Sequence, residues 1–459
     1  MFFALDLCAF PRKLAVLPGP KLDPVPSDLT LPAQVDVVVI GGGIIGTSTA
    51  LELAERGLKV ALCEKGEIGG EQSSRNWGWV RISNRDPREI PLMIAAIRKW
   101  ERMEERTGQR MGYTQTGILF TAANAREHAE YAAWSENLHP HQIECRMING
   151  SELDRLLSGH QMHVKGALYT PIDGRAEPQW AAPGIAKAAR AAGATVHTGC
   201  AVRSLDLEGG RVAGVVTEKG RIKCAQVVLA GGAWSRLFAG NAGVELPQLK
   251  VLNTVMRTTP VSGGPEASAW APGFAIRKRA DGGYTIADGT YNVVDLVPDN
   301  FRLMRQFLPA LKSEWRSLRF RLSDRWRQEA GEARSWQPSE ITPFERTRIL
   351  DPQPIDKIVR SSWAAARKAF PFFDRAEIAQ SWAGMIDVTP DAIPVIGPVD
   401  DLPGLFIGTG FSGHGFGIGP GAGQLLADLV TGQTPVVDPQ DYRLSRFFDG
   451  SKIAQMKGF

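Results

Sequence analysis

The amino-acid sequence predicts an α/β fold in which a parallel sheet is built from discontinuous segments of the chain. Two short and mostly apolar runs, 35–40 and 226–230, have the composition of strands buried on both faces, and glycines follow each of them. Near the end of the chain, the segment 410–423 (GFSGHGFGIGPGAG) carries seven glycines. Because glycine is entropically costly to hold in a fixed fold, so dense a cluster indicates a close approach to the backbone.

The composition is that of an ordinary globular protein of 459 residues, with 43% hydrophobic and 22% charged residues. A net charge of +4 is too small to indicate nucleic acid as the main partner. The five cysteines form no CxxC pair, which disfavours a disulfide framework or a structural zinc site and fits a reducing compartment. The start, MFFALDLCAF, lacks a basic region, and no stretch reaches the ~18 apolar residues of a spanning helix. We therefore expect a cytoplasmic protein, at most peripheral at the inner face of a membrane.

A dinucleotide-binding fingerprint follows a proline-rich extension, 1–34. A strand at 35–40 is followed by Gly41, Gly43 and Gly46 and by a helix at 47–56. A second strand, at 59–63, ends at the acid Glu64. The first glycine makes the tight turn, the second lets a pyrophosphate approach, and the third lets helix and strand pack closely. The helix N-terminus offers unpaired N–H groups to the phosphates, and Ile44 and Ile45, just before it, are also assigned to cofactor binding. Glu64 would bind an adenosine ribose and repel a 2′-phosphate, so NADP is disfavoured while NAD and FAD stay open.

The segments after this fingerprint favour FAD over NAD. A long polar loop, KGEIGGEQSSRNWGWVRIS, can hydrogen-bond phosphates and a flat ring. Strands over 195–223, joined by turns at 209–210 and 219–220, precede the second buried run. FAD is long, so its binding groups come from dispersed parts of the chain. The cofactor residues assigned in these segments are Lys65, Ser73, Ser74, Asn76, Trp77, Gly78, Val202, Ala230, Gly231 and Trp234.

Together these segments resemble the glycine/D-amino-acid oxidase (DAO-type) flavoproteins, which include sarcosine oxidases and D-amino-acid dehydrogenases. The resemblance is carried, in family order, by VVVIGGGIIG, Glu64, SSRNWGWVR, VVLAGGAWS, TPDAIPVIGP and GLFIGTGFSGHGFGIGPGAG. It implies an FAD-dependent oxidoreductase with a Rossmann-type FAD-binding domain and an α+β substrate domain whose mixed sheet covers the flavin. The implied division is 35–88, 161–240 and 371–440 for the FAD-binding domain, 89–160 and 241–370 for the substrate domain, and 441–459 for a tail.

In this family, the last glycine cluster turns beneath the isoalloxazine ring and begins a helix, expected here from Pro420 or Gly421 to about residue 431. Backbone N–H groups and a helix N-terminus aimed at the ring stabilise the charge that develops on reduction. His414 is expected near the ring, with structural and catalytic roles both open. The assigned residues of this part are Gly384, Gly410, Ser412, Gly413, His414, Gly415, Phe416 and Gly417.

The resemblance implies oxidation of an amine C–H next to nitrogen, with hydride delivered to flavin N5 and the imine product hydrolysed to an oxo acid or aldehyde. An amino-acid carboxylate would call for an arginine fork. Arg81 is the first candidate, Arg277 the second and Arg75 the third; with His414, the first two are assigned as catalytic-site residues. Aromatic residues that could wall the pocket, with core packing as the alternative, are Trp77, Trp79 and Tyr284.

Three departures from the sarcosine-oxidase pattern bear on the reaction. Gly417 stands where those relatives carry a carboxylate-binding lysine, and Thr285 where they carry a lysine implicated in oxygen activation. Gly384 stands where they carry a flavin-linking cysteine, so we expect FAD to bind non-covalently. The electron acceptor is left open between O2 and a quinone or other carrier.

The segment 302–334 could bear on the acceptor, because it carries nine basic residues against four acidic ones, and two tryptophans. It is either a basic amphipathic face that touches anionic lipid or a partner, or an ordinary solvated helical stretch.

Two other functions stay open, namely 2-hydroxy-acid oxidation and a role as the flavin-bearing subunit of a hetero-oligomeric dehydrogenase. A metal site is not expected, because HPH at 139–141 and the pair His160 and His163 lack a convincing ligand set.

Overall fold

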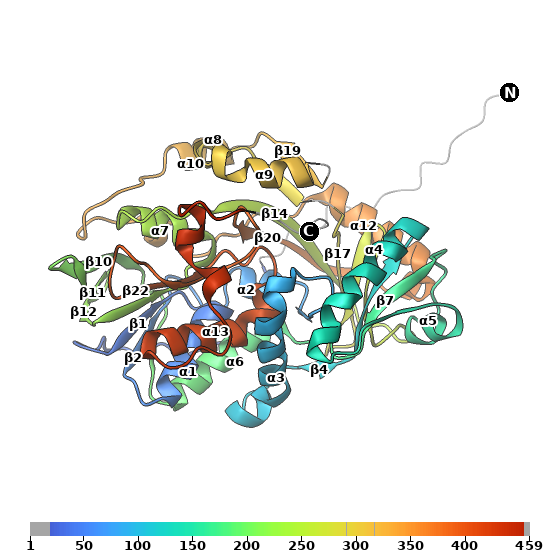
Figure 1. Cartoon of the computed structure of the whole chain (residues 1–459), viewed down its shortest axis with the longest axis horizontal. Coiled ribbons are helices and arrows are strands. Elements are labelled where there is room, and N and C mark those ends of the chain that lie inside the picture. Colours follow the sequence, from blue (N-terminus) through green and yellow to red (C-terminus); the bar gives the residue numbers. More distant parts are fainter. Residues whose placement is uncertain (1–18, 291, 316, 454–459) are drawn as a thin grey trace.

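The computed structural model describes residues 19–290, 292–315 and 317–453, which form two large sheets with helices packed around them (Figure 1). The first sheet has the strand order β21-β22-β13-β1-β2-β9, and all neighbours are parallel except β21 and β22. Its strands are β1 (Val37–Ile40), β2 (Val60–Cys63), β9 (Thr195–His197), β13 (Gln226–Leu229), β21 (Val395–Pro398) and β22 (Leu405–Thr409). The β-branched runs at β1 and β13 are fully or almost fully buried, as a two-sided parallel sheet requires.

The second sheet is mixed, with the order β19-β18-β14-β17-β16-β15-β5-β7-β6, and β20 pairs with β14. Its strands are β5 (Ile118–Ala122), β6 (Arg146–Ile148), β7 (Gly166–Thr170), β14 (Leu249–Thr258), β15 (Ser268–Ala271), β16 (Phe274–Lys278), β17 (Tyr284–Ala287), β18 (Asn292–Asp295), β19 (Leu318–Arg321) and β20 (Ile378–Val388). The predicted α/β class is therefore confirmed, including a parallel sheet assembled from distant segments and a mixed sheet beside it. The small sheet β10 (Val202–Glu208), β11 (Arg211–Thr217) and β12 (Gly220–Lys223) turns at 209–210, as predicted, and at 218–219, one residue before the predicted turn at 219–220.

Glycines let the central helices pack closely. Helix α1 (Ile44–Glu55) lies between α6 (Pro178–Ala191) and α13 (Gly415–Thr431), and α13 also contacts α3 (Ile90–Thr107). A Cβ atom at Gly423 of α13 would lie 2.5 Å from the Cβ of Ser48 in α1. No larger residue fits at that crossing without moving a helix.

Two expectations about local structure were wrong. Helix α13 begins at Gly415, five residues before Pro420, because packing against its neighbours outweighs the low helix propensity of its glycine-rich first turns. In the segment from 86 to about 160, apolar residues at three- and four-residue spacing predict a largely helical structure, but β5 and β6 add strands to the second sheet between α3, α4 (Ala125–Ser135) and α5 (Gly150–Leu156). Strands β7 and β20 also pair in that sheet, although they lie in ranges assigned to the FAD-binding domain; the division into domains stays a prediction.

The described part of the N-terminal extension, 19–34, lies on the surface beside β9 and β12. The carboxylate of Asp28 accepts a hydrogen bond from the Val196 N–H at 2.8 Å, and Gln34 bridges to Lys223. Residues 1–18, which include Cys8 and the start MFFALDLCAF, lie outside the described residues. None of the described helices is both long enough and apolar enough to cross a membrane.

Candidate functional site

A cavity that opens to solvent lies at the carboxyl ends of β1, β2 and β13. In open α/β sheets, ligands bind at this edge. The assigned cofactor residues that line it are Gly41, Gly43, Ile44, Ile45, Glu64, Lys65, Ser73, Asn76, Val202, Ala230, Gly231, Trp234, Gly413, Gly415 and Phe416. Those that do not line it are Gly46, Ser74, Trp77, Gly78, Gly384, Gly410, Ser412, His414 and Gly417.

The glycine turn before α1 is built for a ligand that approaches the backbone. Gly41 has a φ of +108°, and a Cβ there would lie 2.4 Å from the Ala230 carbonyl oxygen. Gly43 is the N-cap of α1 and provides no capping side chain, so the helix N-terminus faces the cavity. The Ile44 N–H donates to Ser73 Oγ at 2.8 Å, which brings the polar loop against this terminus. Such a terminus suits the phosphates of FAD.

Glu64 has the position and the bonding of a ribose-binding acid. Its two carboxylate oxygens accept hydrogen bonds from the Gly42 and Gly66 N–H groups, each at 2.7 Å, and this fixes the side chain at the cavity wall. Burial raises the pKa of Glu64, although the charge of Lys65 and both backbone hydrogen bonds oppose the rise. Each oxygen retains a lone pair that could accept a hydroxyl of the adenosine ribose.

Two acidic residues that the sequence analysis missed also line the cavity and organise its wall. The carboxylate of Glu71 accepts hydrogen bonds from Lys65 Nζ at 2.7 Å and from Trp234 Nε1 at 3.0 Å. Asp387 accepts the Gly410 N–H at 2.7 Å and so holds the final glycine turn. No sequence pattern marks either residue, because Trp234 lies 163 residues from Glu71 and Gln248, which donates to Asp387, lies 139 residues from it.

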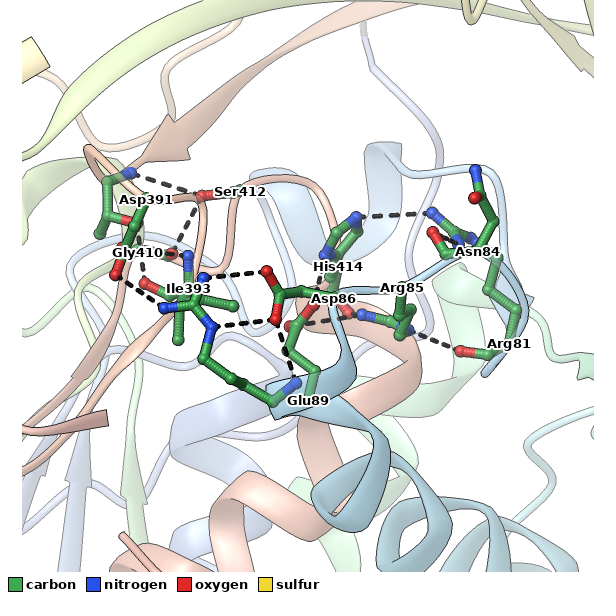
Figure 2. Close-up of polar contacts among 12 residues, drawn as sticks. Arg81, Asn84, Arg85, Asp86, Glu89, Asp391, Ile393, Gly410, Ser412 and His414 are labelled. Carbon is green, nitrogen blue, oxygen red and sulfur yellow. Dashed lines mark hydrogen bonds and ion pairs between the residues drawn. The ribbon is translucent and has the colours of Figure 1, made fainter. Parts of the chain in front are cut away.

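Arg81 and His414, both predicted for the catalytic site, lie together (Figure 2). One terminal nitrogen of Arg81 donates to the Asn84 carbonyl oxygen at 3.2 Å, and the other lies 3.4 Å from His414 Nε2. Among the residues that the structure describes, no carboxylate lies within ion-pair distance of Arg81. Burial lowers the pKa of Arg81 to about 9, so the side chain is still cationic at neutral pH.

The second ring nitrogen of His414 faces a buried carboxylate. Nδ1 lies 3.1 Å from Glu89 Oε2, and burial lowers the pKa of His414 to about 4. Burial also works against ionisation of Glu89, but the hydrogen bond from the imidazole and the positive charges of Arg85 and Arg81 oppose it and lower the pKa of that carboxyl. Glu89 is therefore ionised and His414 neutral near pH 7. Because a carboxylate only accepts, the imidazole proton lies on Nδ1, and Nε2 presents its lone pair to Arg81.

The buried imidazole predicts a pH-dependent stability. An unfolded histidine protonates near its ordinary pKa of 6.5, whereas His414 in the fold resists protonation until about pH 4. Its contribution is therefore complete above pH 6.5 and is lost as the pH falls from 6.5 to 4, by on the order of 3 kcal/mol. Denaturant unfolding at several pH values should show a steeper loss in the wild type than in His414→Gln. Parallel curves for the two proteins would contradict this ionisation state.

The other two arginine candidates are held in ion pairs. Arg277 is buried, its guanidinium lies 2.8 Å from a Glu177 oxygen, and it also donates to Thr285 Oγ1 at 3.1 Å. Arg75 pairs with Asp351 and donates to the Ala383 carbonyl oxygen. This geometry is that of structural ion pairs, so neither side chain is placed to hold a second carboxylate.

An aromatic cluster adjoins Arg81. Trp77 lies 5.4 Å from both Trp79 and Trp270, measured between ring centroids, and Trp270 stacks on Phe120 at 5.8 Å. The Arg81 guanidinium lies 5.4 Å from the centroid of the Phe120 ring. Trp270 and Phe120 were missed, because they reach the cluster from neighbouring strands of the second sheet.

Tyr284, the third aromatic candidate, belongs to a different part of the core. Its hydroxyl donates to the Pro265 carbonyl oxygen at 2.9 Å, and its ring packs on Phe372 and Phe373. We therefore withdraw it as part of the pocket wall. The four cysteines within the described ranges are free and buried, and no group of metal-ligating side chains occurs there.

Comparisons with known proteins agree with this geometry. The DAO family, described as FAD dependent oxidoreductase, matches residues 36–429. Glycine oxidase of Pseudomonas aeruginosa is 27% identical over 88% of this chain and 97% of its own length. Human mitochondrial sarcosine dehydrogenase is 26% identical over 91% of this chain, which covers only 42% of that longer protein.

A solved structure shares the fold over almost the whole chain. L-amino acid deaminase from Proteus myxofaciens, in complex with anthranilate, superimposes with a TM-score of 0.88 and 33% identity, covering 94% of this chain and 97% of the other. The family match spans both large sheets and every segment that lines the cavity. The chain therefore belongs to the DAO family of FAD-dependent oxidoreductases.

Proposed function

We propose that this enzyme oxidises an α-amino acid, with a secondary amine that bears a carboxylate as the next choice. The observation that carries the proposal is Arg81, a largely enclosed cation that is bonded to backbone carbonyls and an imidazole rather than to a carboxylate. His414, which contacts it, stands between two residues that line the cofactor cavity, Gly413 and Gly415. An arginine in that position suits a substrate carboxylate. The likeness to an L-amino acid deaminase supports the L-configuration.

Bound FAD would supply the acceptor for a hydride from the C–H next to the substrate nitrogen; water then converts the imine to an oxo acid and ammonia. Arg81 would orient the substrate by its carboxylate, and the aromatic cluster would keep water from the reacting carbon. A 2-hydroxy acid would require a base, and both ring nitrogens of His414 are already engaged. This favours the amine reaction. Turnover by the isolated chain would distinguish an enzyme from the flavin-bearing subunit of a hetero-oligomer.

We propose that FAD is held non-covalently by the cavity residues. At Gly384, where sarcosine-oxidase relatives carry a flavin-linking cysteine, a Cβ atom would lie 1.8 Å from Gln72 Oε1. Acid precipitation of the purified holoprotein should release all of the flavin into the supernatant, identified as FAD by chromatography. Flavin retained in the pellet would overturn the non-covalent assignment, and a protein that takes up no FAD would overturn the proposed function.

We further propose that the segment around 302–334 contacts an anionic membrane surface. It forms α8 (Pro298–Arg302), α9 (Met304–Glu314), β19 and α10 (Arg325–Ala330), which lie together along the top of Figure 1. Large apolar side chains are exposed along this segment: Phe301, Met304, Leu308, Trp315, Phe320, Leu322 and Trp326. Exposed apolar groups beside an excess of arginine are typical of interfacial binding. This position would also favour a membrane quinone over O2 as electron acceptor.

Vesicle sedimentation tests this contact. We expect the protein to sediment with vesicles of anionic phosphatidylglycerol, to sediment less with neutral phosphatidylcholine, and to lose binding in the double variant Leu322→Ser/Trp326→Ser. The exposed pair Leu29→Ser/Leu207→Ser, which lies outside this segment, provides the control. Equal sedimentation of the first variant and the wild type would contradict the proposal.

A further inference from the structure

The buried carboxylate of Glu89 reaches Arg81 by two routes (Figure 2). Through His414, it fixes the ring nitrogen that accepts from the Arg81 guanidinium. The second route passes through Arg85, whose Nη1 lies 3.5 Å from Glu89 Oε1. Nε of Arg85 donates to the Arg81 carbonyl oxygen at 2.6 Å. Glu89 is fully buried and Arg85 is 2% exposed, so neither can exchange these partners for water.

We infer that Glu89 is a positioning residue that sets the orientation of Arg81 for the substrate carboxylate, acting through His414 and Arg85. This inference rests on the proposed function, because it concerns the arginine that the proposal assigns to the carboxylate. None of these three side chains needs to touch the substrate.

In the series of contacts from Glu89 through His414 to Arg81, the protonation state of each group determines which side its neighbour can bond. Ionised Glu89 keeps the proton of His414 on Nδ1, and Nε2 is then an acceptor for Arg81. Without the carboxylate, the imidazole could carry its proton on Nε2, and two donors would face each other across 3.4 Å. Arg81 would then leave this position. Arg85 would lose its buried counter-charge in the same step, and its hold on the Arg81 carbonyl would loosen.

The two charged networks near Arg81 have different tasks. Asp173 accepts hydrogen bonds from the N–H groups of Ile82 at 2.6 Å and Ser83 at 3.3 Å, so it fixes the backbone after Arg81. Among the described residues, Asp173 forms no hydrogen bond or close ion pair with the guanidinium itself, whereas the imidazole contacts it. The guanidinium nitrogen that faces His414 is therefore assigned to the Glu89 branch, whereas the other terminal nitrogen is held by a backbone carbonyl oxygen.

The test uses the FAD-loaded protein and anthranilate as a carboxylate probe, with its dissociation constant measured from the change in the flavin spectrum. Aniline, which lacks the carboxylate, is the comparison ligand. We expect Glu89→Gln to weaken anthranilate binding by about tenfold and to leave aniline binding unchanged. In an Arg81→Met background, Glu89→Gln should weaken anthranilate binding no further.

His414 provides a second test in case the Glu89 variant folds poorly. His414→Leu should weaken anthranilate binding to a similar extent, and His414→Gln, which retains an acceptor, should restore part of it. Glu52→Gln is the matched control, because Glu52 pairs with Lys99 and Arg106 of α3 and does not contact Arg81.

Each outcome decides a different claim. Wild-type binding of anthranilate that depends on Arg81 but is unaffected by Glu89→Gln and both His414 variants would overturn the positioning role and leave the proposed function standing. Equal weakening of anthranilate and aniline would show a merely structural role and overturn it too. Anthranilate binding by the wild type that does not depend on Arg81, or no binding at all, would overturn the carboxylate assignment in the proposed function and, with it, this inference.

Discussion

Arg81→Met is expected to lower kcat/KM for an amino-acid substrate by a factor on the order of 100 to 1000, because the substrate carboxylate would lose its only assigned cationic partner. The methionine fills a similar volume, and among the described residues no carboxylate would be left unpaired by the change. The FAD content should stay at the wild-type level. Steady-state kinetics and the flavin absorbance of the purified variant measure both quantities.

The control for this prediction is Arg146→Met. Arg146 is exposed, begins β6 at the edge of the second sheet, and pairs with Glu144 and Glu152. We expect its kcat/KM to match that of the wild type. An Arg81→Met protein that keeps its FAD and its full kcat/KM would show that the carboxylate is bound elsewhere.

Gly46→Ala is expected to abolish FAD binding. A Cβ atom at this position would lie 1.9 Å from the Gly41 carbonyl oxygen, so either α1 or the glycine turn must move. The turn and the helix N-terminus together face the cavity, and the variant should therefore lose both the flavin and several degrees of thermal stability. Absorbance of the purified protein and thermal unfolding measure the two effects.

Gly240→Ala is the matched control, because nothing lies within 4 Å of the Cβ position there. The control should retain both its flavin and its melting temperature. Wild-type FAD content in Gly46→Ala would contradict the role given to the glycine turn.

The parts of the fold that could be predicted from the sequence are local ones. The fingerprint at 35–64 places strand, turn, helix and acid within one short stretch, so spacing alone orders them around the cavity. The start of α13 could not be predicted, because its glycines form a helix only against α1 and α3. Strand β5 was missed because both strands that pair with it, β7 and β15, lie far along the chain from it.

In the candidate site, too, local features could be predicted from the sequence and tertiary contacts could not. Single residues such as Arg81 and His414 were predicted from motif position, but their contact joins segments 333 residues apart. Glu89 was not singled out at all, since its role exists only through a partner 325 residues away. The ion pair that occupies Arg277 likewise depends on Glu177, which no spacing rule connects to it. Chemistry carried by tertiary pairs therefore has to come from the structure.

The central claim is that this chain uses FAD to oxidise an amino acid, and anaerobic flavin reduction tests it most directly. The FAD-loaded protein is mixed with L-amino acids, D-amino acids and N-methylated amino acids in the absence of oxygen, and the visible flavin band is followed. The account predicts that the band bleaches with at least one L-amino acid and that an oxo acid appears in equal amount. A flavin that stays oxidised with every one of these compounds would contradict the account.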